Sequence, residues 1–517
     1  KSDHMITFLT KGLIRDRTRS FFPVIVISLT VAIVVFGSGF MRGVMNSMLL
    51  DTAVILSGHE KVVTRAYSEE SQLMPNDLAL LGSNELLKRL FFSATILLFF
   101  ANSSIADETC QSPYMPKITG HEEFVYVWTL GKEGIGDGQD KLVTIDVRPE
   151  SSLRGKVVNS LSVGGRNEAH HGGFTADRRY FWAGGLDTSK IFIFDIHSNP
   201  GAPRLHKVID TFVKDTGGAV GPHTFYGLPG RMMISALSND KDHGGKTALV
   251  EYSNEGKYLA THWMPTRDNL RGATDAHAVA DGYGYDVRAL IRKNVMLTSS
   301  FTGWSNYMMD FGKMLKDGEA MKRFGQTMVQ WDLHTRKPKK VLKVPGAPLE
   351  IRFAWGPQNN YAFTTTALTS KLWLISEGEN GEWDAKSVAD IGDPSKVPLP
   401  VDISIAANDQ TLWINTFMDG MTRLFDISNP HAPQQIYEKK IASQVNMVSQ
   451  SWDGKRVYFT SSVLGNWDKK DADDEQYLKA YSWDGKELKE NFVIDFYKEG
   501  LGRAHIMRFG SSAVSSS

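Results

Sequence analysis

The chain has 517 residues, in which 58 Lys and Arg side chains balance 58 Asp and Glu side chains. This zero net charge gives no global field to attract a nucleic acid, so nucleic-acid binding is not expected. The single cysteine, Cys110, excludes an internal disulfide, a cysteine-based zinc site and a cysteine-ligated cluster, so any metal must be held by histidine, carboxylate or backbone oxygen.

Residues 21–40 carry no charge over about the length that a helix needs to cross a bilayer. This stretch predicts a transmembrane helix and a membrane association through it, and a buried helix of a soluble core is the alternative. Four basic side chains between residues 11 and 19 precede the stretch. The positive-inside rule therefore places the N-terminus in the cytoplasm and the residues from 41 onward outside.

Residues 88–106 have the pattern of a secretory signal peptide. Lys88 and Arg89 precede about twelve apolar residues, and small side chains end the segment at Ala106. The apolar run is short for a membrane span. Cleavage after Ala106 would start a secreted protein at Asp107, which predicts a periplasmic location, with membrane anchoring if residues 1–87 are retained.

The two N-terminal segments conflict, because a signal peptide acts at a free cytoplasmic N-terminus while the span at 21–40 would already have carried Lys88 and Arg89 outside. Residues of about 6–66, which include 12–17 (GLIRDR) and 57–62 (SGHEKV), resemble the start of an ABC-transporter permease of the lipoprotein-export type. That resemblance implies further membrane helices, which do not follow in this sequence. We hypothesise a truncated permease reading frame, residues 1–87, fused to a complete secreted protein.

From residue 107 to the end, short apolar strands end repeatedly in an acidic side chain. The acids at these strand ends are Asp146, Asp195, Glu251, Asp332, Glu377, Asp426 and Asp484. Their spacing is 45 to 58 residues apart from one step of 81, which we attribute to a helical insertion at about 301–325. Seven units of about fifty residues, rich in glycine and aromatic side chains, predict an all-β fold, a seven-bladed β-propeller over residues 107–517.

Histidines in glycine-framed loops are the candidate metal ligands. His170 and His171 precede two glycines, His223 follows Gly-Pro, and His505 lies near the C-terminus, where a propeller commonly closes beside its first blade. Adjacent side chains of a strand face opposite ways, so His170 and His171 can reach one ion only where the chain leaves strand geometry, which the glycines make easy. Imidazoles without thiolate favour copper or zinc over calcium or magnesium.

Residues of about 107–510 resemble the selenium-binding protein family, whose bacterial members include periplasmic methanethiol oxidases. The matching stretches begin at residues 170 (HHGGF), 202 (APRLHKVI), 221 (GPHT), 284 (GYD), 349 (LEIRF), 453 (DGKRVY), 466 (NWDK), 495 (DF) and 501 (LGRAH). The animal members carry a selenium-linked cysteine soon after the first strand, where this chain has 125–131 (VYVWTLG). The resemblance therefore favours copper chemistry over selenium binding.

The resemblance implies a copper-dependent oxidation of methanethiol by O₂ and water to formaldehyde, hydrogen sulfide and hydrogen peroxide. By residue match, His170, His171, His223 and His505 would hold the copper. Four further side chains are candidates for moving protons, namely Asp275, His277, Tyr283 and Asp286. Two other interpretations stay open, a non-catalytic periplasmic propeller that serves as a binding platform, and a metal-dependent propeller hydrolase of the lactonase kind.

Overall fold

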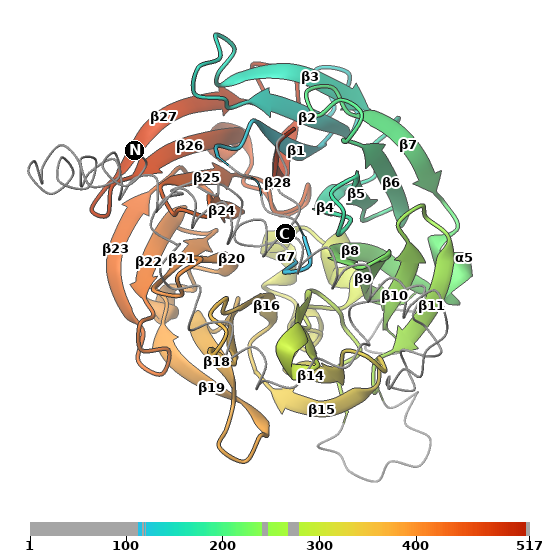
Figure 1. Cartoon of the computed structure of the whole chain (residues 1–517), viewed down its shortest axis with the longest axis vertical. Helices are drawn as coiled ribbons and strands as arrows, with labels where there is room; N and C mark the ends of the chain where they lie inside the picture. The colour runs from blue at the N-terminus through green and yellow to red at the C-terminus, as the bar shows by residue number, and fades with distance from the viewer. Residues whose placement is uncertain (1–111, 116–117, 119, 240–246, 267–278, 513–517) are drawn as a thin grey trace, which may run out of the picture. The chain divides into compact units, whose positions relative to one another are not determined.

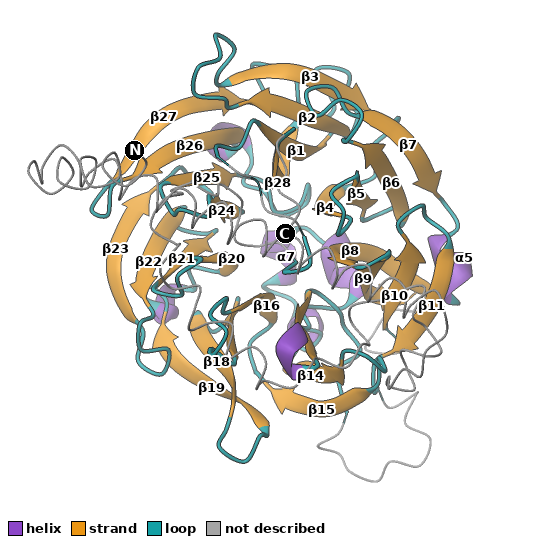
Figure 2. Ribbon diagram, viewed as in Figure 1, coloured by secondary structure: helices purple, strands orange, loops and turns teal. Residues whose placement is uncertain are grey.

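Seven four-stranded antiparallel sheets surround one axis in the computed structural model of the chain (Figure 1). The structure describes residues 112–115, 118, 120–239, 247–266 and 279–512. In each sheet one strand lies next to the axis and the other three follow outward to the rim, so that the sheets form the blades of a propeller (Figure 2). The predicted all-β, seven-bladed architecture is confirmed.

The first three blades have the following strands, in order from the axis to the rim. Blade 1 consists of β28 (Arg503–Gly510), β1 (Phe124–Leu130), β2 (Lys141–Asp146) and β3 (Lys156–Ser162). Blade 2 consists of β4 (Ala169–Phe174), β5 (Tyr180–Gly185), β6 (Lys190–Asp195) and β7 (Arg204–Ile209). Blade 3 consists of β8 (Ala219–Leu228), β9 (Arg231–Asn239), β10 (Ala248–Ser253) and β11 (Tyr258–Trp263), with the short helix α5 (Phe212–Thr216) before it.

The other four blades follow in chain order. Blade 4 consists of β12 (Val287–Leu290), β13 (Val295–Thr298), β14 (Thr327–Asp332) and β15 (Pro338–Lys343). Blade 5 consists of β16 (Pro348–Phe353), β17 (Tyr361–Thr366), β18 (Lys371–Glu377) and β19 (Trp383–Asp390). Blade 6 consists of β20 (Pro400–Ile405), β21 (Thr411–Thr416), β22 (Met421–Asp426) and β23 (Gln434–Lys440). Blade 7 consists of β24 (Val448–Gln450), β25 (Arg456–Thr460), β26 (Tyr477–Trp483) and β27 (Leu488–Asp495). Three 3₁₀ turns, η2 (Ile291–Lys293), η3 (Pro394–Lys396) and η4 (Asp471–Asp473), lie in the connections.

The ring closes between the two ends of the propeller sequence. The last strand, β28, pairs antiparallel with β1, so that Phe124 lies opposite Gly510 and Leu130 opposite Arg503. This closure pairs the inner edge of β1 and joins the two ends of the propeller sequence within blade 1. It also brings His505 next to blade 2, as the sequence predicts.

The acidic repeat marks the third strand of each blade. Six of the seven acids lie in or at the end of β2, β6, β10, β14, β18 and β22, and Asp484 directly follows β26. The 81-residue step has two causes. The predicted insertion between β13 and β14 forms three short helices, α6 (Trp304–Met308), α7 (Phe311–Met314) and α8 (Gly318–Met321), and a long segment of chain, residues 264–286, separates β11 from β12.

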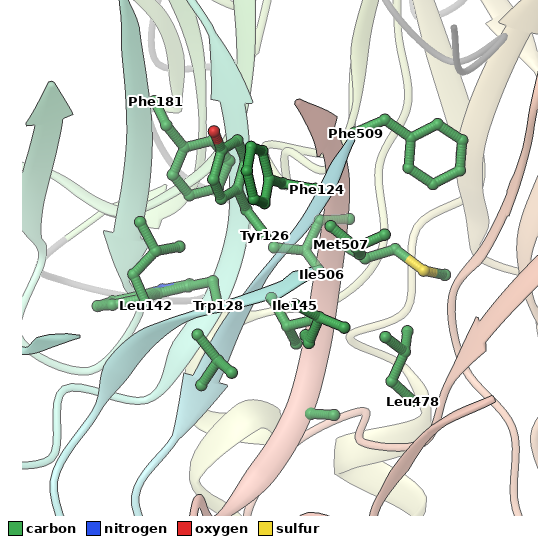
Figure 3. Close-up of a cluster of buried hydrophobic side chains, with 14 of the residues drawn as sticks. Phe124, Tyr126, Trp128, Leu142, Ile145, Phe181, Leu478, Ile506, Met507 and Phe509 are labelled. Carbon is green, nitrogen blue, oxygen red and sulfur yellow. The ribbon is translucent and has the colours of Figure 1, made fainter. Parts of the chain in front are cut away.

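Apolar side chains fill the spaces between neighbouring blades. Inner and middle strands are buried on both faces, while the rim strands such as β3 and β7 are partly exposed. Figure 3 shows one of these cores, which includes Tyr126 and Trp128 of blade 1, Phe181 of blade 2 and Leu478 of blade 7. Each blade is thus fixed by its neighbours, which holds the inner strands at set positions around the axis.

The inner strands begin at one end of the axis, which we call the site face. A separate apolar cluster covers this end of the axis. We call this cluster the roof; it consists of Leu186, Leu237, Tyr285, Phe301, Tyr307, Met314, Ala320, Phe324, Ala347, Leu349, Ala367, Leu399, Val401, Phe417, Leu464 and Trp467. The insertion of blade 4 reaches blade 7 across the ring, where Tyr307 stacks on Trp467 with ring centroids 6.0 Å apart and planes 8° apart. Helix α7 accordingly lies near the centre of the ring (Figure 1).

The N-terminal predictions fall outside the described residues. These are the permease-like segment 1–87 with its span at 21–40, and the signal-peptide-like segment 88–106. Within the part of the chain that the structure describes, no helix has the length and apolar character needed to cross a membrane.

Candidate metal centre

His170 and His171 lie at a β-bulge in the inner strand of blade 2. Ala169 pairs with Gly185 and Gly172 pairs with Ala183, so that the two histidines lie opposite one residue of β5. A bulge turns successive side chains out of their alternation, which lets both imidazoles face the axis. The predicted departure from strand geometry is confirmed.

The glycines after these histidines serve a different purpose from the predicted one. Gly172 and Gly173 both lack a positive φ, so neither provides a left-handed turn. A Cβ on Gly173 would lie 2.1 Å from the backbone oxygen of Phe225, and one on Gly172 would lie 2.5 Å from the ring of Phe181. Gly173 is therefore a glycine because the inner strands of blades 2 and 3 approach each other too closely for a side chain, and Gly172 because the Phe181 ring of the same blade fills the space beside it.

His223 and His505 lie at bulges in the two neighbouring inner strands. The pairing of β8 with β9 shifts between Pro222 and Phe225, and that of β1 with β28 shifts at Ala504 and Met507. Blades 1, 2 and 3 therefore present histidines toward the axis at the same level. Three consecutive blades thus supply the four predicted ligands, although His170 and His505 are far apart in the sequence.

The four imidazoles form one buried cluster. The ring centroids are 3.9 Å apart for His170 and His505, 3.9 Å for His171 and His223, and 4.9 Å for His170 and His171. One ring nitrogen from each of His170, His171 and His223 lies within 4.8 Å of the others. All four side chains are at most 3% exposed.

Each imidazole leaves one buried nitrogen without a hydrogen-bond partner among the described residues. These atoms are His170 Nδ1 and the Nε2 atoms of His171, His223 and His505. Buried polar atoms are nearly always paired, and four unpaired ones in a single cluster call for a shared partner. A metal ion bound through nitrogen lone pairs is a partner that suits all four.

The opposite ring nitrogens orient two of the histidines. His223 Nδ1 lies 2.9 Å from the Tyr285 carbonyl oxygen, so it donates to that oxygen and leaves a lone pair on Nε2. His505 Nδ1 lies 3.3 Å from the side-chain amide nitrogen of Asn446. The arrangement at His223 is typical of histidine ligands, whose second nitrogen is held by a neighbouring acceptor.

The cluster is uncharged at neutral pH. Burial, together with the neighbouring histidines, holds the pKa of His170 and His171 well below the ordinary value of 6.5. Burial likewise lowers the pKa of His223 and His505 to about 3. Neutral imidazoles are the form that binds a metal, and the donor set therefore fits copper, among the metals that accept imidazole.

The predicted proton-transfer residues have different outcomes. Asp275 and His277 lie outside the described residues, and Tyr283 is a buried side chain in the connection before β12. Asp286 directly precedes β12, and burial raises the pKa of its carboxyl to about 6. Their role in proton transfer stays a prediction.

The oxygens of Asp286 already have several partners. Oδ1 accepts from Thr224 Oγ1 at 2.9 Å, Oδ2 accepts from the Ile351 N–H at 2.8 Å, and both Arg288 and Arg352 lie within 3.4 Å. The carboxylate therefore links the inner strands of blades 3, 4 and 5. This arrangement favours a positioning role beside the histidines.

One acidic side chain at the cluster has no counterpart in the sequence-based predictions. Glu350, on the inner strand of blade 5, places Oε1 3.6 Å from His171 Nε2. The signal that pointed to His223 is also present at this position, because a Gly-Ala-Pro segment at 346–348 precedes Glu350 as Gly-Pro precedes His223. The sequence-based prediction rested on glycine-framed histidines, so it did not include a carboxylate.

The model of the 56 kDa selenium-binding protein family matches residues 105–517. The chain belongs to this family. A methanethiol oxidase of Ruegeria pomeroyi is 77% identical to it over 415 residues, which cover 80% of this chain and 95% of that protein. A methanethiol oxidase of a Hyphomicrobium species is 60% identical over 409 residues, which cover 79% of this chain and 91% of the relative.

A solved member of the selenium-binding protein family has the same architecture. The crystal structure of a hypothetical selenium-binding protein from Sulfolobus tokodaii aligns with a TM-score of 0.65 at 26% identity. The alignment covers 77% of this chain and 95% of that one. Residues 105–517 thus form the selenium-binding protein part of the chain, and this range nearly coincides with the predicted propeller.

Proposed function

We propose that the chain is a methanethiol oxidase that uses copper held by His170, His171, His223 and His505. The observation that carries the proposal is the buried cluster of four neutral imidazoles, each with an unpaired nitrogen. The two bacterial relatives named methanethiol oxidase support the substrate and the reaction class. The overall reaction is CH₃SH + O₂ + H₂O → HCHO + H₂S + H₂O₂, in which the carbon loses the two electrons that O₂ gains.

Bound copper would stabilise the thiolate form of the substrate and pass electrons to O₂. The protein's own part is to keep the four imidazoles in place and to exclude bulk water. Tyr285 contributes to both, because its carbonyl oxygen accepts from His223 and its ring lies 4.1 Å from the His223 ring within the roof. A small apolar thiol suits a site beneath such a roof, and protons would leave through the polar side chains beside it, with Asp286 and Tyr283 the described candidates.

A polar cavity of about 460 Å³ lies on the site face, and we propose that a small substrate approaches the cluster through it. Its lining includes Glu168 and Arg503, which come two residues before His170 and His505 in the sequence, but none of the four histidines. The cavity lies beside the inner ends of blades 1 and 2, outside the roof residues of blade 4. It suits the entry of a small substrate and the exit of small polar products.

Oxygen uptake with methanethiol tests the proposed reaction. The copper-loaded protein is expected to consume O₂ only when methanethiol is added, and to form formaldehyde, sulfide and peroxide in equal amounts. Methanol, which lacks the thiol, serves as the control substrate and is expected to give no uptake. Hydrolysis of a lactone without oxygen uptake would favour the hydrolase, and no turnover of either substrate would favour the binding platform.

We further propose that the mature protein is periplasmic and that cleavage occurs after Ala106. The support is the signal-like pattern of residues 88–106 together with a family match that begins at residue 105. Retention of residues 1–87 would instead anchor the propeller through 21–40. N-terminal sequencing of the protein from its native cells is expected to begin at Asp107 or close to it, and an intact Lys1 would contradict the cleavage.

A further inference from the structure

The inner strand of blade 5 repeats the irregularity that places His171. In β16, Pro348 pairs with Thr366 and Ile351 pairs with Thr364, so Leu349 and Glu350 lie opposite one residue of β17. In β4 the corresponding two residues are His170 and His171. Glu350 therefore occupies in blade 5 the position that His171 occupies in blade 2, and the bulge directs both toward the axis.

The two oxygens of Glu350 have unequal surroundings. Oε2 accepts from Arg352 Nη1 at 2.8 Å and lies 3.4 Å from Arg288 Nη2, so it is held on the side away from the histidines. Oε1 has no hydrogen-bond partner among the described residues and lies 3.6 Å from His171 Nε2, which is also unpaired. The side chain is 1% exposed, and a buried oxygen is rarely left unpaired because its lost hydration is then not compensated.

We propose that Glu350 is a ligand of the metal, a carboxylate supplied by blade 5 opposite the histidines of blades 1 to 3. The inference rests on the proposed copper site. The 3.6 Å separation of Oε1 and His171 Nε2 is too long for a hydrogen bond but close to the roughly 3.3 Å between two ligand atoms that each lie about 2.0 Å from one ion. An imidazole that binds a metal through a lone pair brings no charge, so a carboxylate beside the four histidines would supply the negative charge that a buried cation needs.

The test uses copper as the probe and the Cu(II) electron paramagnetic resonance spectrum as the readout. Glu350→Gln keeps the shape of the side chain and removes the anionic oxygen. The variant is expected to retain copper on its four histidines with altered g and hyperfine values, and to release copper to a competing chelator at least about tenfold more readily. Glu350→Asp preserves the charge next to Arg352 but withdraws the oxygen by one methylene, and we expect a changed spectrum from it as well.

Asp402→Asn is the matched control. Asp402, on the inner strand of blade 6, accepts from Arg352 Nη2 at 2.9 Å and from the Val448 N–H at 2.9 Å, and it is 2% exposed. Asp402→Asn removes one buried negative charge that contacts Arg352, the arginine that also contacts Glu350. The copper spectrum of this variant is expected to stay that of the wild type. Copper binding with identical spectra in all variants would overturn the role of Glu350 alone. A wild-type protein that takes up no copper would overturn the proposed copper site as well.

Discussion

Replacing His170 and His171 together by alanine is expected to abolish copper binding and to lower methanethiol oxidation by at least about a hundredfold. Two of the four proposed nitrogen ligands are lost, and both belong to the close group formed with His223. The propeller should stay folded in the double variant, because the His170 Nδ1 and His171 Nε2 atoms form no hydrogen bond within the described residues that the substitutions would remove. The measurements are copper per chain, oxygen uptake and circular dichroism on the same preparations.

The control for this double variant is His197→Ala combined with His431→Ala. These two histidines lie in exposed connections of blades 2 and 6, and their removal changes the histidine count equally. The control is expected to keep both copper and activity. Copper retained by the His170/His171 variant at the wild-type level would place the metal elsewhere in the chain. Copper should also raise the unfolding temperature of the wild type and the control but leave that of the double variant unchanged.

Replacing Glu251 by glutamine is expected to destabilise the propeller by about 3–5 kcal/mol at neutral pH. Glu251 is 1% exposed on β10, and its oxygens lie 2.5 Å from Arg231, 2.8 Å from Arg336 and 2.7 Å from His262. Arg336 belongs to the turn between β14 and β15, so these contacts join blade 3 to blade 4. Loss of the carboxylate removes the negative charge that both buried guanidinium groups contact. Urea unfolding of both proteins measures the difference.

The destabilisation has a definite pH dependence. Burial alone would raise the pKa of Glu251, but Arg336, His262 and Arg231 outweigh burial and hold the pKa below the ordinary 4.5. The stabilising effect is therefore present above the unfolded pKa of 4.5 and is lost as pH falls below it. The difference between wild type and Glu251→Gln should be largest at about pH 7 and should shrink below about pH 4.5.

Glu377→Gln is the matched control for this stability prediction. Glu377 ends β18, at the corresponding repeat position of blade 5, but its side chain is 19% exposed and it pairs with Lys293. A partly exposed pair of this kind contributes about 0–1 kcal/mol. Equal losses of unfolding free energy in Glu251→Gln and Glu377→Gln would contradict the prediction, because the buried contacts of Glu251 would then stabilise the propeller no more than a partly exposed pair does.

The architecture could be predicted from the sequence because each blade carries the same local signal, an acidic side chain at the end of an apolar strand. The seven acids fall on or directly after the third strand of every blade, where a polar end follows a buried apolar strand. Only the step from Glu251 to Asp332 was misleading, since the long segment at 264–286 adds to the predicted insertion. Local patterns report a strand and its end well, but they do not separate two insertions that fall within one repeat.

The candidate site could be predicted from the sequence in part. Histidines with glycine and proline neighbours pointed to the cluster, and ring closure brought His505 to it. The bulges that aim these side chains depend on strand pairing, which no local pattern shows. Glu350 was missed because the prediction considered only histidines, and its place beside His171 is set only once blades 2 and 5 face each other across the axis.

Metal analysis of the wild-type protein, purified from copper-supplied cells, tests the central claim most directly. The four buried imidazoles and the unpaired Glu350 oxygen predict about one copper ion per chain, with nitrogen ligands visible in its spectrum. A protein that is fully folded and contains no copper, even after incubation with excess Cu(II), would contradict the copper site and with it the proposed oxidase.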